Sequence, residues 1–279
     1  MKIDAHQHFW LYDRKDYGWI DDRMQVLKRN YLPGDLQPEL SKTGFSGSVV
    51  VQARQTLEET RWLLQLAGQY DYIKGVVGWV DLCSDSKLKR QLDEFCRSKK
   101  FVGVRHVIQD EPEDNFMLRD DFLKGISLLK AYNLTYDLLL FPKHLSVAQV
   151  FVSMFPEQKF VLDHMAKPLI KKQIIHPWKE DIIRLAKHKN VWCKLSGMVT
   201  EADWKNQKPE DFNPYLDIVF EAFGINRMMI GSDWPVCRLS GEYAAVLGIV
   251  KGYISEMPAH IRQRILGMNC VDFYGLDFR

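Results

Sequence analysis

Two histidines separated by one residue, His6 and His8, lie near the start of the chain. The stretch 1–8 that contains them has the pattern of a short strand, and side chains two positions apart on a strand point to the same face. Imidazole is the commonest metal ligand and the side chain that titrates closest to neutral pH. We therefore expect both imidazoles to project into one site at the end of this strand.

A carboxylate follows another apolar run near the opposite end of the chain. This run stops at Asp233, and Pro235 breaks it two residues later. A carboxylate can accept a proton from water and can also bind a metal ion, so Asp233 complements the two imidazoles. The two segments together predict a site closed by the first and last strands of one barrel.

The strands that would position these groups recur along the chain. Eight apolar runs resemble strands buried on both faces, and most precede an amphipathic stretch of helical length. They span residues 3–8, 47–53, 73–80, 101–107, 134–140, 160–164, 191–196 and 228–233. This alternation predicts a (β/α)8 TIM barrel of the α/β class, in a single domain over 1–279. The alternative fold is a doubly wound open sheet, which would need a glycine-rich turn after its first strand. Residues 8–12, which follow the first strand here, contain no glycine.

Helical periodicity predicts the layer outside the strands. The expected helices span residues 56–69, 86–98, 120–132, 146–155, 178–189, 214–223, 243–256 and 259–266. The segment 9–40 is longer than a simple connection between strand and helix. Its aromatic residues, among them Trp10, Tyr12, Tyr17, Trp19 and Tyr31, suggest that it folds over the barrel mouth.

The polar residues at the strand ends are the candidates for a site. In a barrel of this kind the active site lies at the carboxyl-terminal ends of the strands. The alternative for each residue is a structural role, in which it satisfies buried hydrogen-bonding groups. Together with an aromatic residue after the first strand, the candidates are His6, His8, Trp10, Gln52, Arg105, His106, His164, Lys194 and Asp233.

Composition limits the partners and the compartment. The 38 Lys and Arg against 36 Asp and Glu give a net charge of +2, which argues against nucleic acid or an anionic membrane as a partner. Five cysteines without a CxxC motif indicate free thiols in a reducing compartment. No apolar leader and no membrane-spanning run occurs, so we expect a cytoplasmic protein.

Several short motifs occur in an order that resembles a known family. After the His-x-His strand come GVRH at 103–106, LDHMAKP at 162–168, KLSG at 194–197 and GSDWP at 231–235. This series resembles the amidohydrolase superfamily, and more closely its branch of sugar-lactone hydrolases, of the L-fuconolactonase and L-rhamnonolactonase type. The resemblance implies a barrel with a hydrolytic site at its mouth. The residues that match site positions of the family are His6, His8, His164 and Asp233.

The sequence departs from the dinuclear members of that superfamily. Those members carry a bridging ligand, such as a carboxylated lysine, after the fourth strand and a histidine after the fifth. Here the fourth strand ends in Arg105-His106, and the fifth, at 135–138, has no histidine. We therefore expect either that no metal is strictly required or that one divalent ion, zinc, is bound at most.

These observations predict a hydrolase that opens a sugar lactone to the aldonic acid by an activated water. Asp233 is the expected base, His164 a proton donor to the leaving oxygen, and Arg105 a stabiliser of the oxyanion. The expected substrate-binding residues are Trp10, Gln52, His106 and Lys194, and the expected ligands of a bound metal are His6, His8, His164 and Asp233. Two alternatives remain, a metal-dependent decarboxylase of the same superfamily and a non-catalytic sugar-binding barrel. The expected partner is a small sugar lactone, and assembly of the chain into a homo-oligomer is a further possibility.

Overall fold

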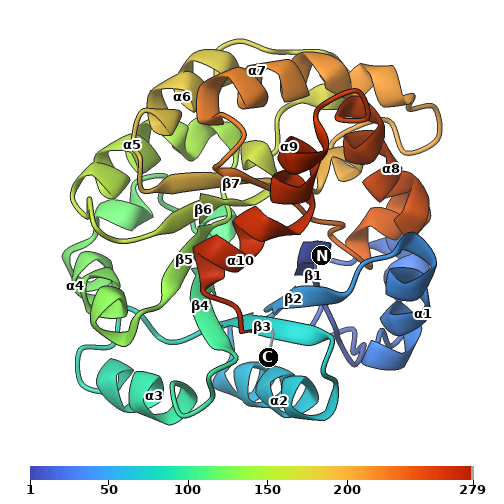
Figure 1. The fold of residues 1–279 in the computed structure, drawn as a ribbon. Helices are drawn as coiled ribbons and strands as arrows, with labels where there is room; N and C mark the ends of the chain where they lie inside the picture. The colour runs from blue at the N-terminus through green and yellow to red at the C-terminus, as the bar shows by residue number, and fades with distance from the viewer. Residues whose placement is uncertain (278–279) are drawn as a thin grey trace.

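Eight parallel strands form a barrel that helices surround (Figure 1). The computed structural model describes residues 1–277. The order of the strands in the sheet is their order in the chain, which confirms the predicted (β/α)8 fold. The strands are β1 (Ile3–Gln7), β2 (Gly47–Val51), β3 (Ile73–Gly78), β4 (Phe101–His106), β5 (Thr135–Leu138), β6 (Phe160–Leu162), β7 (Val191–Leu195) and β8 (Met228–Ile230).

The barrel closes between β1 and the residues that follow β8. The backbone N–H of Asp233 donates to the carbonyl of His6 at 2.8 Å, and the N–H of His8 donates to the carbonyl of Trp234 at 2.7 Å. Gln7 and Trp234 form a parallel bridge between these bonds. The closing seam therefore brings both histidines of β1 against the predicted carboxylate.

The helices cover the outside of the barrel, with two additions to the predicted set. Those additions are α1, which lies inside the segment 9–40, and a last short helix, α10, after the expected end of the helical region. The helices are α1 (Pro33–Thr43), α2 (Leu57–Gln69), α3 (Leu88–Phe95), α4 (Asp120–Leu129), α5 (Leu145–Ser153), α6 (Trp178–Ala186), α7 (Asn213–Phe223), α8 (Tyr243–Tyr253), α9 (Ala259–Gln263) and α10 (Asn269–Tyr274).

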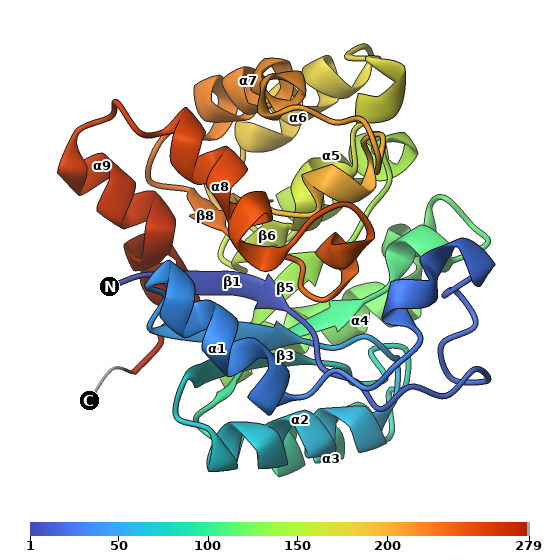
Figure 2. The ribbon, with the colours of Figure 1, turned by 90° about the vertical axis from the view of Figure 1, so that its right-hand side faces the viewer.

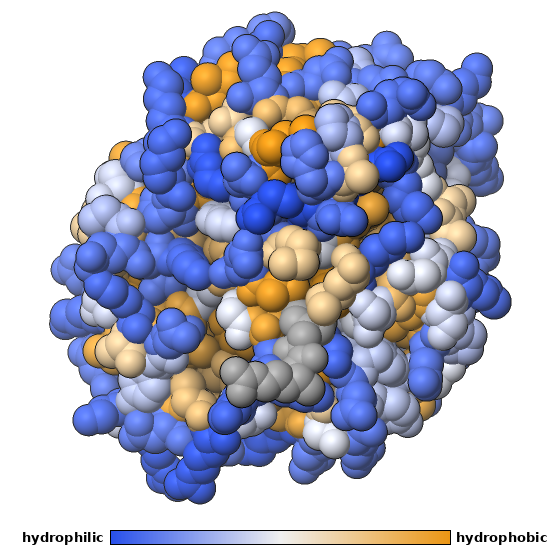
Figure 3. All heavy atoms as spheres, viewed as in Figure 1, coloured by the Kyte–Doolittle hydropathy of each residue, from blue (hydrophilic) through white to orange (hydrophobic). Residues whose placement is uncertain are grey.

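Helix α10 lies across the amino-terminal end of the strands (Figure 1). Phe273 and Tyr274 of this helix pack in one buried cluster with Val161 and Met229 of the strands. Figure 3 shows that the surface at this end is mostly hydrophilic, while apolar residues gather near its centre. This end of the barrel is thus filled, which leaves the carboxyl-terminal end for a site.

The segment between β1 and α1 lies at that carboxyl-terminal end, toward which the strand arrows point (Figure 2). Trp10 pairs with Tyr31 through two backbone hydrogen bonds of 2.9 Å, so the segment returns to its own start. Both side chains are fully buried, whereas Trp19 at the outer part of the segment is 43% exposed. The aromatic segment therefore forms part of the rim, as the sequence suggests. No helix among residues 1–277 has the length and apolar character needed to cross a membrane.

Candidate active site

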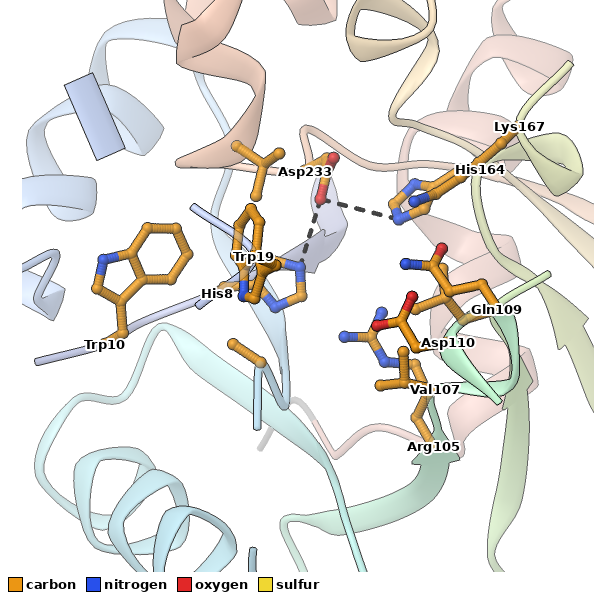
Figure 4. A pocket seen from close by; sticks show the side chains of 13 residues that line it. His8, Trp10, Trp19, Arg105, Val107, Gln109, Asp110, His164, Lys167 and Asp233 are labelled. Carbon is orange, nitrogen blue, oxygen red and sulfur yellow. Dashed lines mark ion pairs between the residues drawn. The ribbon is translucent and has the colours of Figure 1, made fainter. Parts of the chain in front are cut away.

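A cavity of about 180 Å³ opens at the carboxyl-terminal end of the barrel (Figure 4). Its polar lining from the strand ends consists of His8, Arg105, His164 and Asp233, all of them predicted site residues. Loops add a second set of lining side chains that sequence reasoning did not assign to the site. These are Trp19, Gln109, Asp110 and Lys167, with apolar contacts from Ala53, Val107, Leu139 and Val236.

Three imidazoles converge on the carboxylate of Asp233. Its Oδ1 lies 3.3 Å from Nε2 of His8 and 3.8 Å from Nε2 of both His6 and His164. The Nε2 atoms of His6 and His8 are 3.2 Å apart. The structure thus brings together, at the end of the first, sixth and last strands, all four of the predicted metal-ligating residues.

The opposite nitrogen of each ring is held from behind. Nδ1 of His8 donates to the carbonyl of Val51 at 2.7 Å, and Nδ1 of His164 lies 2.9 Å from Oγ of Ser196. Nδ1 of His6 lies 3.3 Å from Oδ1 of Asp163. With protons on these Nδ1 atoms, the three Nε2 lone pairs face Asp233, which is the arrangement that metal-binding histidines adopt.

The local backbone explains why these side chains meet. The register of β1 against β2 slips between Asp4 and Gln7, and such a bulge can redirect a side chain. Glycines then clear the space that the rings fill. A Cβ on Gly197 would lie 2.4 Å from Nδ1 of His164, and one on Gly231 would lie 2.8 Å from Cβ of His6. Larger residues at these two positions would displace the imidazoles.

Burial and charge set the protonation of the cluster. Burial lowers the pKa of His164 to about 4 and that of His6 well below its usual value. Burial raises the pKa of Asp233, but the neighbouring imidazoles, His164 first, outweigh it and hold this pKa below its usual range. Neutral imidazoles beside an ionised carboxylate are the protonation states that bind a metal.

This donor set fits one divalent ion. Ligand atoms at about 2.0–2.2 Å from a zinc ion lie roughly 3–4 Å from one another. The separations among His6, His8 and Asp233 match this range, as does the 3.8 Å between Nε2 of His164 and Oδ1 of Asp233. Three imidazoles and one carboxylate are also the ligand types that zinc prefers. The chemistry of these four residues therefore suits a single zinc ion, for which His6, His8 and Asp233 form a compact set of ligand atoms.

A second group of charges lies beneath the cluster, inside the barrel. Oδ2 of Asp163 is 3.1 Å from Nη1 of Arg105, and its Oδ1 is 3.0 Å from Nζ of Lys194. Lys194 also pairs with Asp137, whose Oδ2 accepts from the hydroxyl of Tyr274 at 2.9 Å. Burial lowers the pKa of Lys194, but the two aspartates outweigh it and raise this pKa, so the ammonium stays charged. Asp163 therefore links His6 to two buried cations.

The structure places the four predicted substrate-binding residues differently. Trp10 lines the cavity, and its Nε1 donates to the carbonyl of Arg29 at 2.9 Å. Gln52 is buried outside the lining, and its Nε2 donates to the carbonyl of Arg105 at 3.1 Å. The substrate-binding assignment of both residues stays a prediction.

His106 and Lys194 also lie outside the lining of the cavity. Nε2 of His106 is 2.6 Å from a carboxylate oxygen of Glu111, and the ring stacks on Phe116. Lys194 is completely buried among the charges described above. In the structure both side chains contact other protein groups. Their predicted role in substrate binding stays a prediction.

Known proteins resemble this chain over almost its entire length. Residues 3–276 match the family model described as amidohydrolase. The chain is 37% identical to an L-fucono-1,5-lactonase from Burkholderia multivorans, over 99% of this chain and 96% of that protein. It is 36% identical to an L-fucono-1,5-lactonase from Burkholderia ambifaria, with the same coverage.

A solved structure adds a comparison in three dimensions. A crystal structure of an amidohydrolase from Burkholderia multivorans, with bound zinc, is 38% identical and aligns with a TM-score of 0.96. The match covers 99% of this chain and 100% of that one. With the match to the family model and the shared barrel, this likeness shows that the chain belongs to the amidohydrolase family.

Proposed function

We propose that this protein hydrolyses a sugar lactone of the L-fucono-1,5-lactone type to the free aldonic acid. The observation that carries the proposal is the convergence of three imidazoles on one carboxylate that lines the cavity, in a chain similar to L-fucono-1,5-lactonases over 99% of its length. A decarboxylase and a non-catalytic sugar-binding barrel are not favoured by these relatives. The substrate is thus a small cyclic ester.

The cluster would hold one zinc ion through His6, His8, His164 and Asp233. Bound there, zinc supplies a more acidic water and polarises the ester carbonyl. The solved relative that contains zinc supports this assignment. An ester is more electrophilic than an amide, so the charges of the protein itself carry a larger share of the catalysis than they would for a peptide bond.

Asp233 is the proposed base of the reaction. Its carboxylate is ionised, and its largely buried side chain lines the cavity together with His8 and His164 (Figure 4). A carboxylate within hydrogen-bond reach of the attacking water can accept its proton as the water adds to the carbonyl carbon. Nη1 of Arg105 lies 3.4 Å from Nε2 of His6, the nitrogen that faces Asp233, and adds positive charge to this side of the site.

The remaining lining suits a single sugar ring. A cavity of about 180 Å³ is smaller than the sites that hold drug-sized ligands. Gln109 and Asp110 offer polar partners for ring hydroxyls, while Trp19 and Val236 offer apolar surface for the face of the ring or a deoxy-sugar methyl. These loop residues are the proposed determinants of the sugar.

We also propose that the protein acts in the cytoplasm. All five cysteines are free, which suits a reducing compartment. The substrate is a small molecule.

A screen of aldonolactones tests the proposed activity. Ring opening releases an acid, so a pH indicator follows the rate against the spontaneous hydrolysis of each lactone. We expect L-fucono- and L-rhamnono-lactones to be turned over fastest, with the rate proportional to enzyme concentration. If purified protein accelerated no lactone in such a panel above the spontaneous rate, with zinc present or absent, the proposal would be wrong.

A further inference from the structure

Four residues in succession after β6 have left-handed backbone conformations. The φ angles of His164, Met165, Ala166 and Lys167 are 53°, 52°, 58° and 52°. None of them is glycine, and side chains with a Cβ are disfavoured in this region. A run of this kind persists only where the surrounding structure fixes it, and such runs concentrate at functional sites. It begins at a residue of the imidazole cluster and ends at Lys167.

The turn is firmly anchored. Met165 and Ala166 are fully buried, and the carbonyl of Met165 accepts a hydrogen bond of 2.8 Å from Nε1 of Trp178. The N–H of Lys167 donates to the carbonyl of His164 at 2.8 Å. As a result the Lys167 side chain extends beside His164 and lines the cavity (Figure 4).

Arg105, the other cation of the lining, has both terminal nitrogens engaged, while its Nε is buried without a partner. Nη1 lies 3.1 Å from Asp163, and Nη2 donates to the carbonyl of Gln52. The side chain of Arg105 is 4% exposed. Its charge is thus balanced by a buried carboxylate, and it has little capacity left for a substrate oxygen.

Lys167 differs in this respect. Within residues 1–277 its ammonium has no carboxylate within 4 Å and makes no hydrogen bond, and its nearest described partner is the ring of Phe141, 5.4 Å from Nζ. Glu201 and His164 lie close enough for their pKa values to respond to its charge. A strained backbone therefore brings a cation with free donors to the cavity beside the proposed reaction centre.

We propose that Lys167 is a catalytic residue of the lactone hydrolysis, whose ammonium donates a hydrogen bond to the departing ring oxygen. This inference rests on the proposed function. Water adds to the carbonyl carbon while Asp233 takes one of its protons. The bond between that carbon and the ring oxygen then breaks, its electron pair moves to the ring oxygen, and the positive charge of Lys167 stabilises the forming alkoxide. The proton taken by Asp233 finally neutralises this oxygen, so one water is consumed and one hydroxy acid is formed.

Substitution of Lys167 tests the proposal. We expect Lys167→Met to lower kcat roughly 100-fold, as loss of a donor to developing negative charge does, while KM changes by less than about threefold. Lys167→Arg keeps a cation with hydrogen-bond donors, so its kcat should be at least about tenfold higher than that of Lys167→Met. The matched control is Lys171→Met, because Lys171 is 65% exposed and lies 3.7 Å from Asp203 on the outside. This control should behave as wild type.

The outcomes separate this inference from the proposed function. A Lys167→Met variant with kcat near that of wild type, a loss confined to KM, or an arginine variant as slow as the methionine variant would each overturn the role of Lys167. A wild-type protein without lactonase activity would instead overturn the function. Zinc binding by the methionine variant at the wild-type stoichiometry is expected and shows that the cluster beside it stays folded.

Discussion

Nε2 of His8 lies 3.3 Å from Oδ1 of Asp233, although one residue stands near the beginning of the chain and the other follows the last strand. The contact exists because backbone hydrogen bonds join the segments of the two residues at the closing seam of the barrel. Barrel closure and assembly of the candidate site are thus one structural event, and both follow from residues at the two ends of the sequence.

Replacing Asp233 by asparagine should remove the base without changing the shape of the site. An amide cannot accept the proton of the attacking water, so we expect Asp233→Asn to lower kcat roughly 100-fold or more on the best lactone. Asp85→Asn is the control, since this aspartate is 70% exposed and pairs with a surface lysine. Near-normal turnover by Asp233→Asn would refute the assignment of the base.

The cluster should bind one zinc ion per chain. The separations between its donors suit one ion, and its Nδ1 atoms are already held by other groups. Equilibrium dialysis followed by metal analysis should give one zinc per wild-type chain. For His8→Asn we expect affinity to fall at least about tenfold, whereas His176→Asn, at a 71% exposed position, should match wild type. Two tightly bound ions, or unchanged affinity in His8→Asn, would contradict the single site.

Chelation should leave much of the lactonase activity in place. The ester is intrinsically electrophilic, and Lys167 keeps a positive charge at the cavity without a metal. We expect wild type treated with a strong chelator, and verified as metal-free, to retain most of its kcat. A complete loss that added zinc restores would show instead that the ion is indispensable.

Gly197 should be required for the position of His164. A Cβ at this residue would collide with the imidazole at 2.4 Å, and its φ of +64° already disfavours a side chain. Gly224 has nearly the same φ, +66°, but nothing lies within 4 Å of its Cβ position. We expect Gly224→Ala to cost roughly 1–3 kcal/mol of stability, because its ψ of 165° also favours glycine, but to keep full activity. Gly197→Ala should abolish turnover. Equal activity of the two variants in steady-state assays would contradict this.

Acid should destabilise the metal-free protein partly through His164. Burial lowers the pKa of this imidazole from 6.5 to about 4. Between these values the unfolded chain binds a proton that the folded chain does not, so stability falls as pH drops from about 6.5 to about 4. The contribution of this residue reaches about 3 kcal/mol over that window.

Urea unfolding of wild type and His164→Asn, with chelator present, isolates this effect. Other buried groups titrate in both proteins, so the difference between the two free energies of unfolding is the informative quantity. We expect wild type to lose stability relative to the variant as the pH falls through the window. Parallel curves would mean that His164 does not titrate in this way.

The strand pattern predicted the barrel because buried parallel strands are short and nearly continuously apolar. Helix α1 escaped prediction, since Pro38 inside it and the aromatic residues before it resemble an irregular loop. Helix α10 escaped because it follows α9 through one π-helical turn, Arg264–Met268, without a break in the sequence pattern. That residues 1–279 form one domain stays a prediction.

The sequence predicted which four residues form the imidazole and carboxylate cluster. It predicted less well which side chains line the cavity around them. His6, His8, His164 and Asp233 converge because they stand at strand ends. Lys194 stands on the same barrel, yet it lies deeper, where charged groups pair with one another. Depth along a strand depends on register, which local spacing does not encode. Gln109 and Asp110 come from a short loop helix, Ile108–Asp110, whose position only the folded chain reveals.

The closing seam has a consequence for how the protein is made. While a ribosome is still adding residues before 228, β1 has no partner on its open side, and His6 and His8 lack the carboxylate of Asp233. The barrel therefore closes and the candidate active site becomes complete at the same stage, late in synthesis. A nascent chain should be inert and easily digested by protease until its final strand emerges.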